Sequence, residues 1–163
     1  INHIELLKGG FPARYGSRTS SVIDISMKEG NQNQFHGNAT LGVISSKALL
    51  EGPLGKDVSF LVSGRRSYLN LLQSRFIQPQ TEGISDDYNF YDLNAKLNYR
   101  INDNNRIYFS AYTGSDHAGA TSENSYVDQN LDFTSSSVST IDWGNAIAAV
   151  RWNHIVSNQL FSN

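Results

Sequence analysis

The chain has 163 residues, a formal net charge of −2 and no cysteine, and 39% of its residues are hydrophobic. The absence of cysteine excludes disulfides, zinc–thiolate sites and thiol nucleophiles, and the near-neutral charge excludes a broad basic surface for nucleic acid. No apolar run approaches the roughly 18 residues that a membrane-spanning helix needs.

Residues 1–30 are predicted to contain two short β-strands separated by a turn. Two runs typical of β-strands, at 4–7 and 22–27, flank a turn-forming stretch at 9–16 that is rich in glycine and contains a proline. A polar linker at 30–34 follows, and a different kind of sequence begins beyond it. We therefore expect a domain boundary near residue 31, between a unit at 1–30 and a second one at 31–163.

Beyond the linker, apolar and polar residues alternate with the two-residue period of a β-strand. The longest stretch runs from Tyr91 to Ile101, with Lys96 and Arg100 on its polar face. Similar stretches occupy 35–43, 58–65, 107–111 and 144–152. Leu61, Ile147 and Ala149 break the alternation, because they are apolar at polar-face positions. The prediction is an all-β chain, an antiparallel meander of about five long strands.

The predicted connections alternate in length. Short ones lie at 52–57, 102–105 and 157–158, and long ones at about 73–87 and 113–142. Antiparallel strands joined in this way place all tight turns at one end of the sheet and all long loops at the other. Outer-membrane β-barrels have this arrangement, with short periplasmic turns and longer extracellular loops.

The strand at 91–101 has the length of a barrel strand. Tyr91 and Tyr99 lie about 26 Å apart at roughly 3.3 Å per residue, which is about 19 Å of membrane thickness at a tilt near 45°. Tyrosines at both ends of an apolar band resemble interfacial girdles, although a soluble β-sandwich also buries alternating tyrosines. In a barrel, Arg65, Lys96 and Arg100 would face the lumen. Trp143 and Trp152, nine residues apart, are expected on opposite faces.

The long segment 113–142 contains acidic residues and no lysine or arginine. Its candidates for binding a ligand in an extracellular loop are Asp116, His117, Glu123 and Asp128. A lone histidine in a polar loop is more often solvated than metal-bound, so no metal site is predicted. No serine, histidine and aspartate occur in a catalytic motif order, and no glycine-rich loop ends in the lysine of a phosphate-binding motif. We expect neither enzyme activity nor a cofactor.

Three motifs follow one another in the first thirty residues. They are Glu5 in an apolar strand that ends in Lys8-Gly9, then Arg14-Tyr15-Gly16, then a strand that contains Asp24 and closes in Lys28. This order resembles the end of the plug domain of TonB-dependent outer-membrane receptors. The sequence departs from that pattern at 17–21, where glycines are usual, and at Asp24, where asparagine is common. Segments 49–55 and 63–68 look like those of the large receptors of Bacteroidota.

The resemblance implies a fragment that covers the end of a plug and the first strands of a barrel of about 22 strands. It implies active uptake of a nutrient, either a glycan, a peptide or an iron chelate, across the cell outer membrane. The partners would be a periplasmic TonB-type energy-coupling protein, membrane lipid and a surface lipoprotein. A passive porin and a secreted glycan-binding β-sandwich are the alternatives. The chain begins without methionine and stops inside an alternating stretch, so we expect a piece of a longer protein, which would oligomerise in isolation through its open sheet edges.

Overall fold

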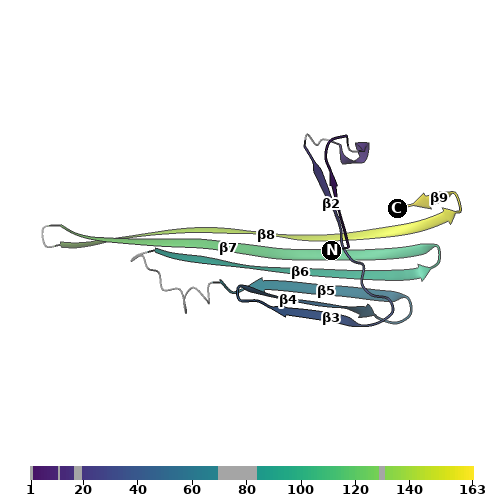
Figure 1. The fold of residues 1–163 in the computed structure, drawn as a ribbon, viewed down its shortest axis with the longest axis horizontal. Helices are drawn as coiled ribbons and strands as arrows, with labels where there is room; N and C mark the ends of the chain where they lie inside the picture. The colour runs from purple at the N-terminus through teal and green to yellow at the C-terminus, as the bar shows by residue number, and fades with distance from the viewer. Residues whose placement is uncertain (1, 11, 17–19, 70–83, 129–130) are drawn as a thin grey trace.

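The computed structural model describes residues 2–10, 12–16, 20–69, 84–128 and 131–163. Its elements are β1 (His3–Leu7), the 3-10 helix η1 (Ala13–Tyr15), β2 (Val22–Ser26), β3 (His36–Leu41), β4 (Ser45–Pro53), β5 (Val58–Ser67), β6 (Ile84–Asn102), β7 (Asn105–Asp128), β8 (Leu131–Ser157) and β9 (Leu160–Ser162). Figure 1 shows the pair β1–β2 standing across a long, gently curved sheet. Within these ranges, no helix is long and apolar enough to cross a membrane.

The strands form two antiparallel sheets. β1 pairs with β2, and β3 to β9 form a seven-stranded sheet in which each strand pairs with the next one in the chain. The predicted all-β antiparallel meander is therefore confirmed, with seven strands in place of about five. The prediction placed a strand at 35–43 and no turn before 52–57. It missed the connection at 42–44, because this connection lacks the polar residues typical of turns. This connection is short and lies at the end predicted to carry long loops, so the strict alternation of loop lengths was wrong.

The predicted long loop at 113–142 was also wrong. β7 and β8 pair without interruption from Asn105↔His154 to Asp128↔Leu131. Serine and threonine occupy both faces over much of this stretch, so the apolar alternation that identifies a strand is missing, although the backbone ladder is complete. Figure 1 shows β6, β7 and β8 extending well beyond the ends of β3, β4 and β5. Of the other predicted loop, 84–87 belong to β6, and the earlier residues lie outside the described part.

The long sheet has one apolar and one polar face. Residues directly opposite one another in an antiparallel pair share a face, so the register extends the alternation of β6 across the sheet. We call the face of Leu93, Ala95 and Leu97 the apolar face, and that of Asp92, Asn94 and Lys96 the polar face. Four rows of the apolar face, from the row of Tyr99 to that of Leu93, contain no charged side chain from β4 to β8.

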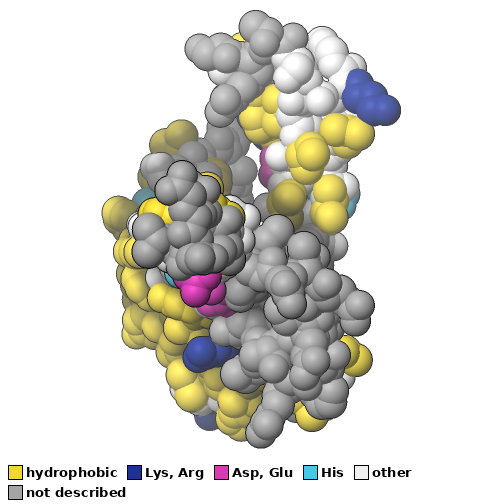
Figure 2. Space-filling model, turned by 90° about the vertical axis from the view of Figure 1, so that its left-hand side faces the viewer, with side chains coloured by type: hydrophobic (Ala, Val, Ile, Leu, Met, Phe, Trp, Pro, Cys, Tyr) yellow, Lys and Arg dark blue, Asp and Glu magenta, His cyan; other side chains and the backbone are white. Residues whose placement is uncertain are grey.

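None of the described residues covers the apolar face. Leu61 is the single buried hydrophobic side chain among the described residues, and it lies on the polar face. On the apolar face, Leu50, Leu93 and Val150 remain 51%, 46% and 70% exposed. Figure 2 shows hydrophobic side chains gathered along one flank of the sheet. Removal of these side chains from water would be favourable by about 25 cal/mol per Å² of apolar surface.

The two tryptophans lie on opposite faces, as their spacing predicted. Trp143 pairs with Asp116 on the polar face, and Trp152 pairs with Ile107 on the apolar face. The β7–β8 register has no bulge between these two positions, so the two-residue period is kept.

Candidate functional site

The polar face of the long sheet carries most charged residues of β4, β5 and β6, whereas Arg66 and Asp87 lie on the other face. The register places Arg65 opposite Asp92. On β6, Asp92 is four residues before Lys96 and eight before Arg100, and even spacings keep side chains on one face of a strand. All three predicted lumen-facing residues therefore share this face. Arg65 Nε donates to Asp92 Oδ2 at 2.7 Å, and Arg100 Nη2 donates to Asp57 Oδ1 at 2.9 Å. Arg65 and Arg100 are thus held in ion pairs.

Residues 27–35 join β2 to β3 and are called the linker from here on. They are bound to this face by their own charges. Lys96 Nζ donates to Glu29 Oε1 at 3.3 Å, and Arg151 Nη2 of β8 lies 3.9 Å from the same oxygen. Lys28 Nζ lies 3.8 Å from Glu51 Oε1. The two neighbouring linker residues therefore carry opposite charges that match opposite charges on the sheet.

Glu51 is the most buried charged group of this contact. The residue is 5% exposed, with Lys28 on one side and His36 Nδ1 at 3.5 Å on the other. A carboxylate withdrawn from water requires such partners, because a buried charge without them is strongly unfavourable. Glu51 sits opposite Leu61, so two nearly fully buried residues lie side by side on the polar face.

The three apolar residues that interrupt the polar alternation lie close together on the polar face. Leu61, Ile147 and Ala149 line one small cavity on the polar face together with Met27 of the linker. The cavity has a volume of about 210 Å³. The apolar exceptions thus mark the place where an apolar linker side chain lies against the sheet.

Gly30 completes the contact between linker and sheet. Its φ of +91° is in the left-handed region, and a Cβ built there would lie 2.6 Å from the backbone oxygen of Phe60. Both the conformation and the close approach exclude a side chain. The backbone of the linker can therefore rest directly on β5.

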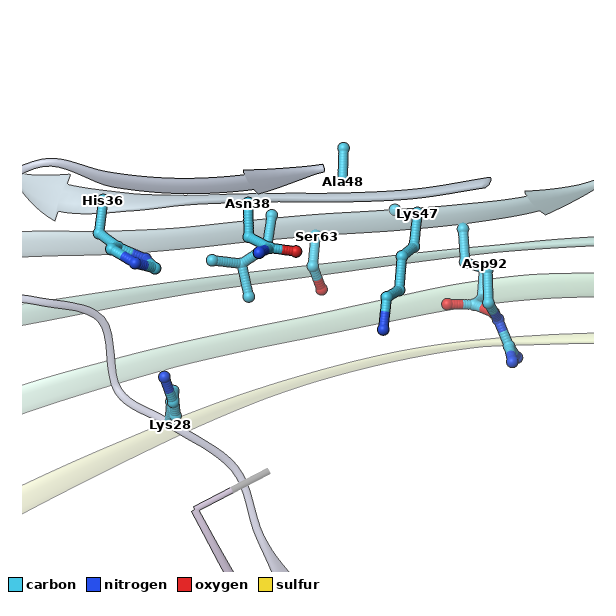
Figure 3. A pocket seen from close by; sticks show the side chains of 10 residues that line it. Lys28, His36, Asn38, Lys47, Ala48, Ser63 and Asp92 are labelled. Carbon is cyan, nitrogen blue, oxygen red and sulfur yellow. The ribbon is translucent and has the colours of Figure 1, made fainter. Parts of the chain in front are cut away.

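A groove opens on the same face beside the linker. It has a volume of about 600 Å³. Its charged lining consists of Lys28, Lys47, Arg65 and Asp92, with His36, Asn38 and Ser63 as further polar residues. Figure 3 shows His36, Asn38, Lys47, Ser63 and Asp92 pointing to the side of the sheet where Lys28 lies, whereas Ala48 points away.

The predicted plug motif forms a compact polar cluster on the two-stranded unit. Glu5 and Asp24 lie directly opposite each other on β1 and β2. Tyr15 donates its hydroxyl hydrogen to Asp24, and Arg14 Nη2 donates to the Tyr15 oxygen at 2.8 Å. The hydrogen bond to Asp24 is the main cause that raises the pKa of Tyr15.

The remaining residues of this motif shape the turns or join the sheet. Gly9 has a φ of +66°, which glycine tolerates best, and Gly16 closes η1 by donating its N–H to the Ala13 oxygen. Lys8 follows directly after β1, and Lys28 belongs to the linker contact.

The predicted loop ligands do not form one site. Asp116, His117 and Glu123 lie on β7, not in a loop, and the side chain of Asp128 lies outside the described residues. Asp116 and His117 are adjacent on a strand and so point to opposite faces. Asp116 accepts a hydrogen bond from the Tyr88 hydroxyl at 3.3 Å. On the other face, His117 contacts the carboxylates of Asp142 and Asp87.

His117 is placed between carboxylates of both neighbouring strands. Its Nδ1 lies 2.5 Å from Asp142 Oδ1, and its Nε2 lies 3.7 Å from Asp87 Oδ2. The hydrogen bond to Asp142 is the main cause that raises the pKa of His117 above its ordinary value. In the described residues, no three histidine, aspartate or glutamate side chains are arranged to hold a metal ion.

Sequence reasoning missed Glu29, Glu51 and Lys47. A usable signal existed for the last two, because Lys47 and Glu51 are four residues apart on β4 and so share a face. The face on which Lys47 and Glu51 lie could be assigned only once the turn between β3 and β4 was known. For Glu29 no local signal exists, because its partner Lys96 is 67 positions away in the chain.

Comparisons with known proteins place the chain in no family. No family model, no curated protein and no solved structure matches it.

Proposed function

We propose that this chain is a wall segment of a transmembrane β-barrel from a TonB-dependent outer-membrane receptor that takes up a nutrient. The observation that carries the proposal is the sidedness of the long sheet. Four rows of its apolar face lack charge across five strands, while the polar face of the same strands carries Glu51, Arg65, Lys96 and Arg151. On a lipid-facing position, a lysine or arginine would cost about 2–4 kcal/mol at mid-membrane.

The exposure of the apolar face favours lipid over a soluble sandwich. A sandwich covers its apolar face with a second sheet about 10 Å away. In the described residues, β1–β2 is the other sheet, and its linker docks on the polar face, not on the apolar one. An apolar band without a protein cover is what a barrel wall presents to acyl chains.

The free edges fit a wall that continues. β3 and β9 are the outer strands of the sheet, and each has one edge that pairs with no other described strand. A barrel closes such edges by pairing them with further strands. In this proposal, the strands that complete the barrel lie elsewhere in a longer protein, and the polar face lines its lumen.

The linker contact supports the receptor over a passive porin. Lys28 and Glu29 join the β1–β2 unit to the polar face through ion pairs, so a domain inside the lumen would be held by contacts that can be broken without exposing a hydrophobic core. The nature of the cargo, a glycan, a peptide or an iron chelate, and the partnership with an energy-coupling protein are proposed from the plug-like motif alone.

Fractionation of cells that produce the full-length protein tests the proposal. We expect the protein in the outer-membrane fraction, resistant to extraction with alkaline carbonate, and recovery in the periplasm or medium would overturn the membrane assignment. Deletion of its gene should then abolish uptake of one nutrient, and collapse of the proton-motive force should have the same effect. Uptake that survives that collapse would identify a passive channel.

A further inference from the structure

The groove beside the linker is lined by a row of side chains in which positive charges outnumber negative ones. Lys47 lies directly opposite Arg65 in the β4–β5 register, and Thr40 lies on its other side. Like charges directly opposite each other destabilise an antiparallel pair. Asp92, opposite Arg65 on β6, supplies one negative charge to this row of two cations.

Arg65 is held firmly in this row. Its guanidinium donates to Asp92 at 2.7 Å and lies 4.6 Å from the centre of the Phe90 ring. The salt bridge of this row joins Arg65 to Asp92. Within the described residues, Lys47 forms no ion pair with a carboxylate. The row therefore faces the groove with an excess of positive charge.

The rest of the groove offers contacts to an extended molecule. The next row along the strands consists of Asn38, Leu49 and Ser63, which combine hydrogen-bonding groups with one apolar side chain. Lys28 stands at the far end, beside Glu51. Lys47 and Glu51 are four residues apart, which is about 13 Å along the strand. The groove volume of about 600 Å³ is in the range of ordinary small-molecule sites.

We propose that this groove binds an elongated, carboxylate-bearing organic molecule, with its carboxylate between Lys47 and Arg65 and its polar body over Leu49, Asn38 and Ser63. A bound carboxylate would relieve the repulsion between the two cations, and charge-assisted hydrogen bonds are about twice as strong as neutral ones. The groove lies on the polar face, so binding there does not depend on what covers the apolar face.

The test uses two probes of equal size, lactobionate, which carries a carboxylate, and lactose, which does not. Binding to the purified full-length protein, kept in detergent only if its solubility requires it, is measured by calorimetry. We expect saturable binding of lactobionate and at least tenfold weaker binding of lactose. Equal binding of both sugars, or no saturable binding of lactobionate, would overturn the proposal.

Charge variants then locate the site. Lys47→Gln should weaken lactobionate binding at least tenfold, while Lys56→Gln, the same charge change in the β4–β5 turn, should leave it within twofold. Equal effects of the two variants would mean general charge attraction and no specific site. Asn38→Asp, on the exposed edge strand, gives an independent check if Lys47→Gln does not fold, and it should also weaken binding at least tenfold. Unchanged binding in Asn38→Asp would count against the groove.

Discussion

Lys96 of β6 and Glu29 of the linker lie 3.3 Å apart, although 67 residues separate them in the chain. This contact, with that of Lys28 to Glu51, determines where the β1–β2 unit is attached to the long sheet. The same polar face carries the proposed carboxylate groove. A change in linker attachment would therefore alter one wall of that groove.

Lys96→Gln should loosen the linker without changing the linker sequence. Arg151 remains near Glu29, so we expect a loss of about 0.5–1 kcal/mol, typical of one partly exposed ion pair. Hydrogen exchange of the amides of residues 27–31 should become roughly two- to fivefold faster. Lys56→Gln is the matched control and should leave this exchange unchanged. Equal exchange in Lys96→Gln and the unmodified protein would show that the ion pair does not hold the linker.

Gly30→Ala should detach the linker more strongly. The variant combines a positive φ, which costs about 1–3 kcal/mol for a residue with a side chain, with a contact of 2.6 Å to the Phe60 backbone. Gly55→Ala has a similar φ of +102° but meets open space, so it measures the conformational cost alone. The free energy of unfolding in urea should fall in both variants and further in Gly30→Ala. Equal losses would mean that the linker does not rest on β5.

The alternation of residues predicted the faces of the sheet but not the linker contacts. Parity alone was enough to place Lys96 and Arg100 on one face, because the period of a strand is two residues. The extended β7–β8 hairpin was missed, since around Ser122 and Ser137 both faces are polar. The attachment of Glu29 depends on the curvature and register of the whole sheet, and no local pattern encodes these.

Neighbouring cysteines on β8 should report opposite environments. The 163 residues contain no cysteine, so Val150→Cys and Ala149→Cys each introduce one on opposite faces. With nitroxide labels in lipid vesicles, the label at 150 should collide mainly with oxygen, which concentrates in acyl chains. The label at 149 should show a larger relative contribution from a water-soluble nickel chelate. Identical collision ratios at both positions would contradict the proposed lipid-facing side.

Protonation of His117 should stabilise the extension formed by β6, β7 and β8. His117 lies one row beyond Tyr91, outside the uncharged band, between Asp142 at 2.5 Å and Asp87 at 3.7 Å. The hydrogen bond to Asp142 raises the pKa of His117 above 6.5 in the folded protein. A raised folded pKa means that the stabilisation is complete below pH 6.5 and is lost as the pH rises through the folded pKa.

Amide exchange at 113–121, corrected for its intrinsic pH dependence, should therefore be slower at pH 6 than at pH 9. Asp142→Asn removes the main acceptor and should abolish most of this difference, while Glu123→Gln, further along the same strand, should preserve it. A pH dependence that persists in Asp142→Asn would assign the effect to other groups.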